Sequence, residues 1–166
     1  MSYFIVDVEA DGPFPGVYSM VSFGAVKVDN ELNHTFFSEV IRPIATQYDE
    51  EALSISGVTR DQQLDSLIYP NEVMSEFEKW IKNVNKRGTH PVFVSDNNGF
   101  DWQFINGYFI MYNDGYNPFG WSSRRLSDMF AGFYQNARYS WKKHRKTKHT
   151  HHPVDDAMVM QKHFYT

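Results

Sequence analysis

The chain of 166 residues contains no cysteine. This absence excludes disulfide bonds, thiolate catalysis and zinc sites built from cysteine, and it is typical of proteins from a reducing compartment. Long apolar runs are also missing, because no uninterrupted stretch approaches the roughly 20 residues that cross a bilayer. The amino-terminal segment shows no basic region followed by an apolar one, so no secretory signal is predicted. We therefore expect a cytoplasmic protein without a membrane partner, folded as a single domain over residues 1–166.

Acidic residues are missing from one long stretch, between Asp128 and Asp155. The whole chain has a net charge of −4, so this stretch departs from the rest of the sequence. Clustered lysine and arginine side chains either form a solvated loop or bind the phosphates of a polyanion, and composition alone leaves both interpretations open. Besides four histidines, the stretch contains the cations Arg138, Lys142, Lys143, Arg145, Lys146 and Lys148.

The hydrophobic pattern predicts strands that first follow one another and then alternate with helices. The predicted strands are residues 3–9, 19–29, 33–41 and 92–95, with a tight turn at 29–32. Four helices are predicted. One begins at Pro70 and another at Pro153, and the other two cover residues 100–111 and 127–135. Proline suits the first turn of a helix, and this order of elements is typical of an α/β domain with a mixed sheet.

Two carboxylates stand on the first predicted strand, Asp7 and Glu9 in the stretch F-I-V-D-V-E-A. Because side chains in a strand alternate between faces, both point the same way as Ile5. One interpretation is that this face of the strand is exposed to solvent. However, both faces of the strand carry apolar residues, which is typical of a sheet covered on both sides. Ionised groups that leave water need a partner or a metal ion. Ligand sites in open sheets lie beyond the carboxyl ends of strands, so the loop after residues 92–95 is expected beside these acids.

Two further acids and a histidine follow along the chain. Asp101, in N-N-G-F-D-W-Q-F, would lie in the first turn of a helix, and Asp156, in H-H-P-V-D-D-A-M, would adjoin the inner side of the last helix. His151 stands five residues before Asp156. Each has a plain interpretation, since an acid in a first turn complements the helix dipole and His151 can belong to a solvated basic loop. Four carboxylates without a thiol are hard oxygen ligands, which suit Mg²⁺ or Mn²⁺.

These motifs together resemble the DEDDh superfamily of 3′–5′ exonucleases, which includes the proofreading subunit of DNA polymerase III, RNase T and oligoribonuclease. The resemblance rests on D-V-E at 7–9, N-N-G-F-D-W-Q-F at 97–104 and H-H-P-V-D-D at 151–156, in the order of the superfamily. Weaker similarity lies at 55–60 and 70–77, and the short chain is most similar to the bacterial and phage exoribonucleases of the mycobacterial type. The resemblance implies a ribonuclease H-like fold with five central strands, the second antiparallel to the others, flanked by helices.

The resemblance also implies a catalytic role for each acid. Asp7 would bridge two Mg²⁺ or Mn²⁺ ions, Glu9 and Asp156 would complete the first metal site, and Asp101 would reach the second. Two such ions about 4 Å apart can activate a water and stabilise the leaving oxygen of a phosphodiester. His151 would act as the general base on that water, a task suited to a group with an ordinary pKa of about 6.5. The imidazoles at 144, 149 and 152 compete for this role, but the spacing to Asp156 favours His151.

The sequence departs from the family directly after the first motif. The family usually has Thr-Gly and an apolar residue there, which contact the terminal nucleotide, whereas this chain has Ala10-Asp11-Gly12. Phe14 or Tyr18 could instead supply a stacking surface for a base. The candidate substrate contacts are Val8, Ala10, Phe14, Tyr18, Asn97 and Phe104.

The expected partners are the 3′ ends of single-stranded RNA or DNA, with RNA favoured, and the expected products are nucleoside monophosphates. Family members often work as homodimers, and the aromatic residues of 108–121 are candidates for such an interface. Two other functions stay open. Residues 138–152 could form a non-catalytic nucleic-acid binding surface, or the histidines at 144, 149, 151 and 152 could sequester a transition metal.

Overall fold

The protein, seen here as a computed structural model that describes residues 1–29, 34–144 and 153–164, is built on one five-stranded sheet. The strands lie in the order β3-β2-β1-β4-β5. β1 pairs antiparallel with β2 and parallel with β4, and β2 pairs antiparallel with β3, so the second strand alone opposes the others. This arrangement confirms the predicted mixed α/β sheet. The strands are β1 (Ser2–Ala10), β2 (Met20–Lys27), β3 (Thr35–Ser38), β4 (Pro91–Ser95) and β5 (Ser123–Arg125).

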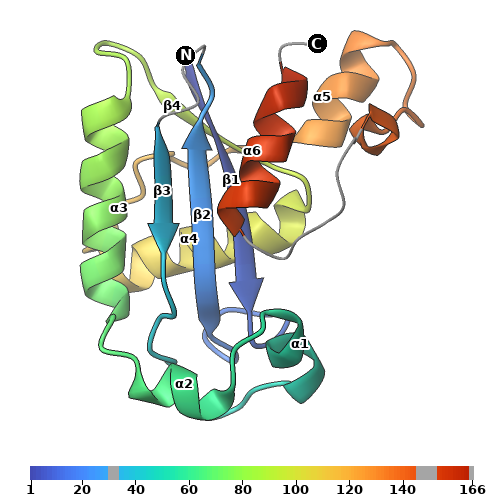
Figure 1. Ribbon diagram of the computed structural model, residues 1–166. Helices are drawn as coiled ribbons and strands as arrows, with labels where there is room; N and C mark the ends of the chain where they lie inside the picture. Colours follow the sequence, from blue (N-terminus) through green and yellow to red (C-terminus); the bar gives the residue numbers. More distant parts are fainter. Residues whose placement is uncertain (30–33, 145–152, 165–166) are drawn as a thin grey trace.

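Helices cover both faces of this sheet (Figure 1). Figure 1 shows α6 in front of β1 and β2 and α4 behind them, while α1 and α2 lie at the end where β1 finishes. The helices are α1 (Glu50–Ile55), α2 (Arg60–Asp65), α3 (Pro70–Val84), α4 (Asn98–Tyr112), α5 (Leu126–Phe133) and α6 (Pro153–Phe164), with a short 3₁₀ helix at Trp141–His144. Within the described part of the chain, no helix combines the length and the apolar character that a membrane crossing would require.

The alternation of side chains along β1 divides the core into two layers. Phe4, Val6 and Val8 pack in the layer beneath α3 and α4, where Phe77 contacts Phe23 with ring centroids 4.8 Å apart. Ile5 packs in the layer beneath α5 and α6. A strand that is apolar on both faces is therefore covered on both faces, as its composition predicts.

Several elements differ from their predicted bounds. The third strand is shorter than predicted, and β5, α1 and α2 were not predicted from the pattern. Short elements give too few apolar positions for a periodicity, and β5 reads only Ser-Arg-Arg. Both short helices instead carry capping signals: the Asp49 side chain accepts from the Ala52 amide, and Thr59 forms a capping box with Gln62. The predicted turn at 29–32 lies mostly outside the described residues.

Candidate active site

The site begins with the two acids of β1. Asp7 and Glu9 share the face of Ile5, which is the face covered by α6. Asp7 lies opposite Gly24 of β2 in the antiparallel ladder, and Glu9 lies opposite Ser22, just before a register shift at Ala10. Only the pair of Ala10 with Met20 lies beyond this shift, so Glu9 stands one residue before the end of β1 and Asp7 three residues before it.

The first turn of α6 brings a third acid to this face. A Cβ atom built on Gly24 would stand only 2.5 Å from the backbone nitrogen of Val154, so the start of α6 rests directly on the backbone of β2. Two residues further along this turn, Asp156 is 2% exposed, and its charge raises the pKa of both Asp7 and Glu9. The close approach of helix and strand therefore places Asp156 beside the acids of β1.

The fourth acid comes from the opposite layer. Asp101 lies in the first turn of α4, and its Oδ1 accepts a hydrogen bond of 3.2 Å from the Val8 amide of β1. The side chain is 2% exposed. Within the described residues its Oδ2 has no hydrogen-bond partner in good geometry, and the same is true of the nearby Ser95 hydroxyl. A buried carboxylate oxygen without a donor is costly, and a cation is one way to satisfy it.

The electrostatics of the four acids indicate that they share one small volume. Burial and then the charges of Asp101 and Glu9 raise the pKa of Asp7 well above its ordinary value. Burial, together with Asp156, raises the pKa of Glu9 to about 7. Burial also raises the pKa of Asp101 to about 8, although the Ser95 hydroxyl, which lies near the carboxylate without a well-formed hydrogen bond, and the Val8 amide act against this. Like charges within a few ångströms have this effect on one another.

This acidic cluster has the chemistry of a site for hard divalent cations. Its ligands are carboxylate oxygens alone, it has one buried oxygen without a donor, and its mutual repulsion would be relieved by a positive charge. Among the residues that the structure describes, no three carboxylates or imidazoles already converge as a ready chelate. The residues thus fit Mg²⁺ or Mn²⁺ in the type of ligand, as an open acidic cluster and not as a closed cage.

Residues 4–164 match the family of exonucleases described as RNase T. The chain belongs to this exonuclease family. The match confirms the predicted membership of the DEDDh superfamily. The 3′–5′ DNA exonuclease Cap18 of Escherichia coli is 35% identical over 143 residues, which make up 86% of this chain and 73% of Cap18.

Solved structures support the fold of this exonuclease. The nuclease domain of 3′hExo, a DEDDh family member bound to rAMP, has a TM-score of 0.74 at 19% identity, covering 98% of this chain and 89% of that domain. E. coli exonuclease I in complex with an oligonucleotide has a TM-score of 0.71 at 17% identity, covering 97% of this chain and 39% of exonuclease I. These likenesses confirm the ribonuclease H-like fold.

A fifth acid of the exonuclease, Asp96, was not predicted as a site residue. It follows β4 directly, and its charge raises the pKa of both Asp7 and Asp101. Its Oδ1 accepts a 2.7 Å hydrogen bond from Nε1 of the buried Trp141, and its Oδ2 lies 3.1 Å from Nζ of Lys142. The rule that sites lie at the carboxyl ends of strands could have found Asp96, since it ends a strand next to β1.

The stretch Ala10-Asp11-Gly12, where the exonuclease departs from its family, has a structural explanation. Asp11 has no exposed surface, and its Oδ1 accepts a 2.5 Å hydrogen bond from the Ser19 amide. Its Oδ2 accepts bonds of 3.0 Å from Arg60 Nη1 and 3.2 Å from Gln63 Nε2. Asp11 therefore joins the loop after β1 to α2 and points away from solvent. The sequence did not indicate this burial, because an aspartate in a polar loop is normally expected to face solvent.

The predicted substrate contacts separate into buried and accessible residues. Val8 and Ala10 are 5% and 6% exposed, and Phe104 has no exposed surface, so these side chains pack in the core. Phe104 packs against Phe100 with ring centroids 5.1 Å apart, and it presents no surface to a nucleotide in this structure.

The three remaining candidates lie nearer the surface. Phe14 is 57% exposed, and Asn97, at the start of α4, is exposed as well. The Tyr18 ring packs against Gly12, where any Cβ would stand 2.0 Å from it, and its hydroxyl accepts a bond from Gln47. Phe14 is thus the aromatic ring most available to a base. His151, the predicted general base, lies outside the described residues, as do His149 and His152.

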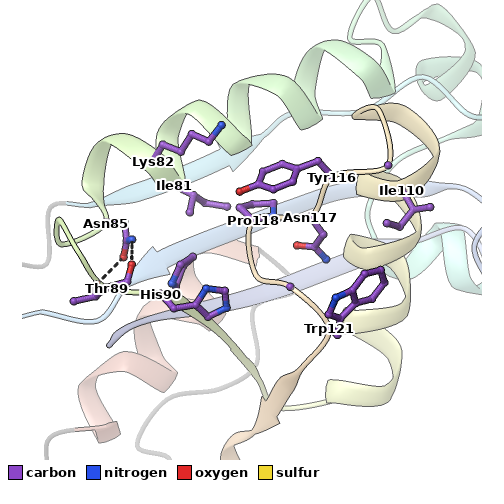
Figure 2. Close-up of a pocket in the computed structure, with 13 residues that line it drawn as sticks. Ile81, Lys82, Asn85, Thr89, His90, Ile110, Tyr116, Asn117, Pro118 and Trp121 are labelled. Atoms are coloured by element: carbon purple, nitrogen blue, oxygen red, sulfur yellow. Dashed lines mark hydrogen bonds between the residues drawn. The ribbon is translucent and has the colours of Figure 1, made fainter.

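A pocket of about 490 Å³ lies far from the acids, beside the first residue of β4 (Figure 2). Its polar groups hold the protein's own loops: His90 Nε2 bonds to the Phe119 carbonyl, and Asn85 bonds to Thr89. No carboxylate lines it. It therefore offers no catalytic acid, in contrast to the opposite end of the sheet.

The aromatic residues predicted to serve a dimer interface are divided in the same way. Tyr108, Phe109 and Phe119 are buried in the core, whereas Tyr116 and Trp121, at the pocket of Figure 2, are 50% and 88% exposed. Tyr112 is half-buried, so Tyr116 and Trp121 are the rings of this set most open to contact with a second copy of the chain, and the homodimer stays a prediction.

Proposed function

We propose that this exonuclease removes nucleotides one at a time from the 3′ end of single-stranded DNA, using divalent metal ions held by Asp7, Glu9, Asp101 and Asp156. The observation that carries this proposal is the electrostatic coupling of these acids, which come from β1, α4 and α6: burial and neighbouring carboxylates raise the pKa of Asp7, Glu9 and Asp101. DNA is favoured because the relative at 35% identity is a 3′–5′ DNA exonuclease. RNA, the substrate that the sequence resemblance favours, is the alternative.

The chain's own residues have distinct tasks in this reaction. The Val8 amide holds the Asp101 carboxylate through Oδ1, which leaves Oδ2 available to a metal ion. Asp7, whose pKa responds to all the other acids, is the natural centre of the cluster. When bound, Mg²⁺ or Mn²⁺ would supply activation of the attacking water and stabilisation of the leaving oxygen.

The proton of the attacking water would pass to the His151 imidazole, a role taken from the family resemblance. The water oxygen would form a bond to phosphorus while the bond from phosphorus to the upstream 3′ oxygen breaks. The departing 3′ oxygen would take up a proton from solvent, so the products are a nucleoside 5′-monophosphate and a strand shorter by one nucleotide with a free 3′ hydroxyl.

The decisive experiment follows 5′-labelled single strands of DNA and RNA with matched sequence, with Mg²⁺, with Mn²⁺ and with chelator. We expect a ladder of products shortened from the 3′ end that requires the metal. Asp7→Asn should lower kcat by about 10³-fold or more, because a central metal ligand is lost. The matched control is Asp61→Asn, which changes an exposed acid on α2.

Two results would overturn the proposal: neither strand is shortened, or Asp7→Asn keeps full activity. The non-catalytic alternative predicts something different. It expects salt-sensitive binding of single strands without metal and without any shortening, and no effect of changing Asp7.

A further inference from the structure

The acidic cluster of Asp7, Glu9, Asp101 and Asp156 has two flanks, set by the strand order. On one side of β1 lies β2, and the loop of residues 11–19 that joins them carries the exposed Phe14. On the other side lie β4 and β5, which run parallel to β1 and therefore end at the same edge of the sheet. A strand that is cleaved at the acids must leave the site across one of these flanks.

Cations gather on the β4–β5 flank. Arg125 ends β5, pairs with Ser95 at the end of β4, and donates from Nε to the Asp96 carbonyl at 3.3 Å. Lys142 contacts the side chain of the same residue, with Nζ 3.1 Å from Asp96 Oδ2. Arg125 also pairs loosely with the exposed Asp128, with Nη1 3.7 Å from Oδ1. The side chains of Arg125 and Lys142 keep 51% and 59% of their surface exposed, so both can take a further ligand.

Asp96 places these two cations close to the catalytic acids. Its carboxylate lies near enough to Asp7 and Asp101 for its charge to raise the pKa of both. The buried Trp141, 1% exposed, holds the Asp96 carboxylate through Nε1 and thereby keeps Lys142, the next residue, in position. A cation held beside a cluster of carboxylates is well placed for phosphates that reach the cluster.

The geometry points to Arg125 and Lys142 as a binding site for the phosphate backbone of the substrate strand, on the 5′ side of the nucleotide that is removed. This inference rests on the proposed function. The loop flank with Phe14 offers an exposed aromatic ring for the terminal base, whereas the β4–β5 flank offers two exposed cations. The exonuclease would thus hold a strand of several nucleotides more tightly than a single nucleotide, independently of sequence.

The test compares a substrate that reaches only the acids with one that also reaches the flank. The first is the p-nitrophenyl ester of thymidine 5′-monophosphate, and the second is a single-stranded DNA of about 16 nucleotides, a length that covers a typical single-strand site. For Arg125→Gln/Lys142→Gln, we expect the ratio of kcat/KM for the oligonucleotide to that for the ester to fall about 10-fold. Arg125→Lys/Lys142→Arg, which keeps both charges, should restore most of this ratio.

A binding measurement gives an independent readout. In the Asp7→Asn background, which prevents cleavage, the slope of log affinity against log salt should decrease in magnitude by about 1.4, or about 0.7 for each lost phosphate contact. The matched control, Lys86→Gln/Arg87→Gln, removes two exposed cations in the turn before β4, at the opposite end of the sheet, and should change neither readout.

The inference is wrong if the ratio and the salt slope do not change, or if both substrates lose activity equally, since the two cations would then only support the catalytic site. Failure of the proposed function looks different, because the unchanged protein would hydrolyse neither the ester nor the oligonucleotide.

Discussion

Gly24 lies directly beneath Val154: a Cβ atom on the glycine would stand 2.5 Å from the backbone nitrogen at the start of α6. The same glycine faces Asp7 in the β1–β2 ladder. One residue without a side chain therefore determines how closely the helix that carries Asp156 approaches the strand that carries Asp7.

Gly24→Ala should damage both stability and activity. The new methyl group meets backbone atoms, which cannot rotate away, so α6 must shift from the sheet. We expect the free energy of unfolding in urea to fall by about 1–3 kcal/mol and kcat for a single-stranded oligonucleotide to fall with it. The matched control is Gly132→Ala on α5, where a Cβ would meet nothing within 4 Å. Equal stability and activity in Gly24→Ala would show that α6 does not need this close contact.

Glu9→Gln should stabilise the metal-free protein at high pH. Burial raises the pKa of Glu9 to about 7 from an ordinary 4.5, so the folded state holds this proton more tightly than the unfolded state does. Stability contributed by such a group is present below about pH 4.5 and is lost as pH rises towards 7. Glutamine does not ionise, so the Glu9→Gln variant does not lose this stability as the pH rises. Since part of the side chain stays in water, we expect a gain of about 1–2 kcal/mol near pH 8 and none near pH 4.

Thermal unfolding at both pH values, with chelator present, measures this difference. The exposed Glu76→Gln provides the control and should change little at either pH. Added Mg²⁺ should then raise the melting temperature of the unchanged protein near pH 8 more than that of Glu9→Gln, because the variant has lost a ligand. A glutamine variant that is less stable near pH 8 would contradict this account of the acidic cluster.

Arg60→Gln should be strongly destabilising. Arg60 lies 3.0 Å from Asp11, a carboxylate with no exposed surface, so its loss leaves a buried charge without its cation. We expect a cost of about 3–5 kcal/mol in urea unfolding. The double variant Asp11→Asn/Arg60→Gln should recover part of that cost, and the double-mutant cycle isolates the pair. Asp61→Asn, next in sequence but exposed, should change stability by no more than about 0.5 kcal/mol.

Phe14→Ala and Phe104→Ala should separate substrate binding from packing. Phe14 is 57% exposed, so its removal should raise KM for oligonucleotides several-fold and leave stability within about 0.5 kcal/mol. Phe104 has no exposed surface, so its removal should cost about 3–5 kcal/mol of stability. Steady-state kinetics and urea unfolding of both variants test this; an unchanged KM for Phe14→Ala would leave the terminal base without an aromatic partner on this loop.

Local patterns predicted much of the fold. The helical periodicity after Pro70 correctly predicted α3, and the apolar run at 92–95 predicted β4 to within one residue. β5 could not be predicted in this way, because an edge strand of three polar residues is stabilised by pairing with β4 and not by its own apolar side chains. The roles of Phe104 and Tyr18 were equally beyond reach, since an aromatic residue in a motif looks the same whether it packs inward or faces a ligand.

The sequence by itself determined which chemical groups the exonuclease has and roughly where they stand: Asp7 and Glu9 at the end of a strand, and Asp101 and Asp156 in first turns of helices. These are local properties, because polarity and spacing along the chain place residues within their own elements. Only the tertiary structure decided that Asp96 is held by Trp141 and Lys142, that Asp11 is a buried partner of Arg60, and that Gly24 allows α6 to pack directly on β2. Each of these contacts joins segments that are distant in the sequence. The packing of such segments determines how far a side chain is buried from water, and burial in turn determines the pKa and the charge of its carboxylate.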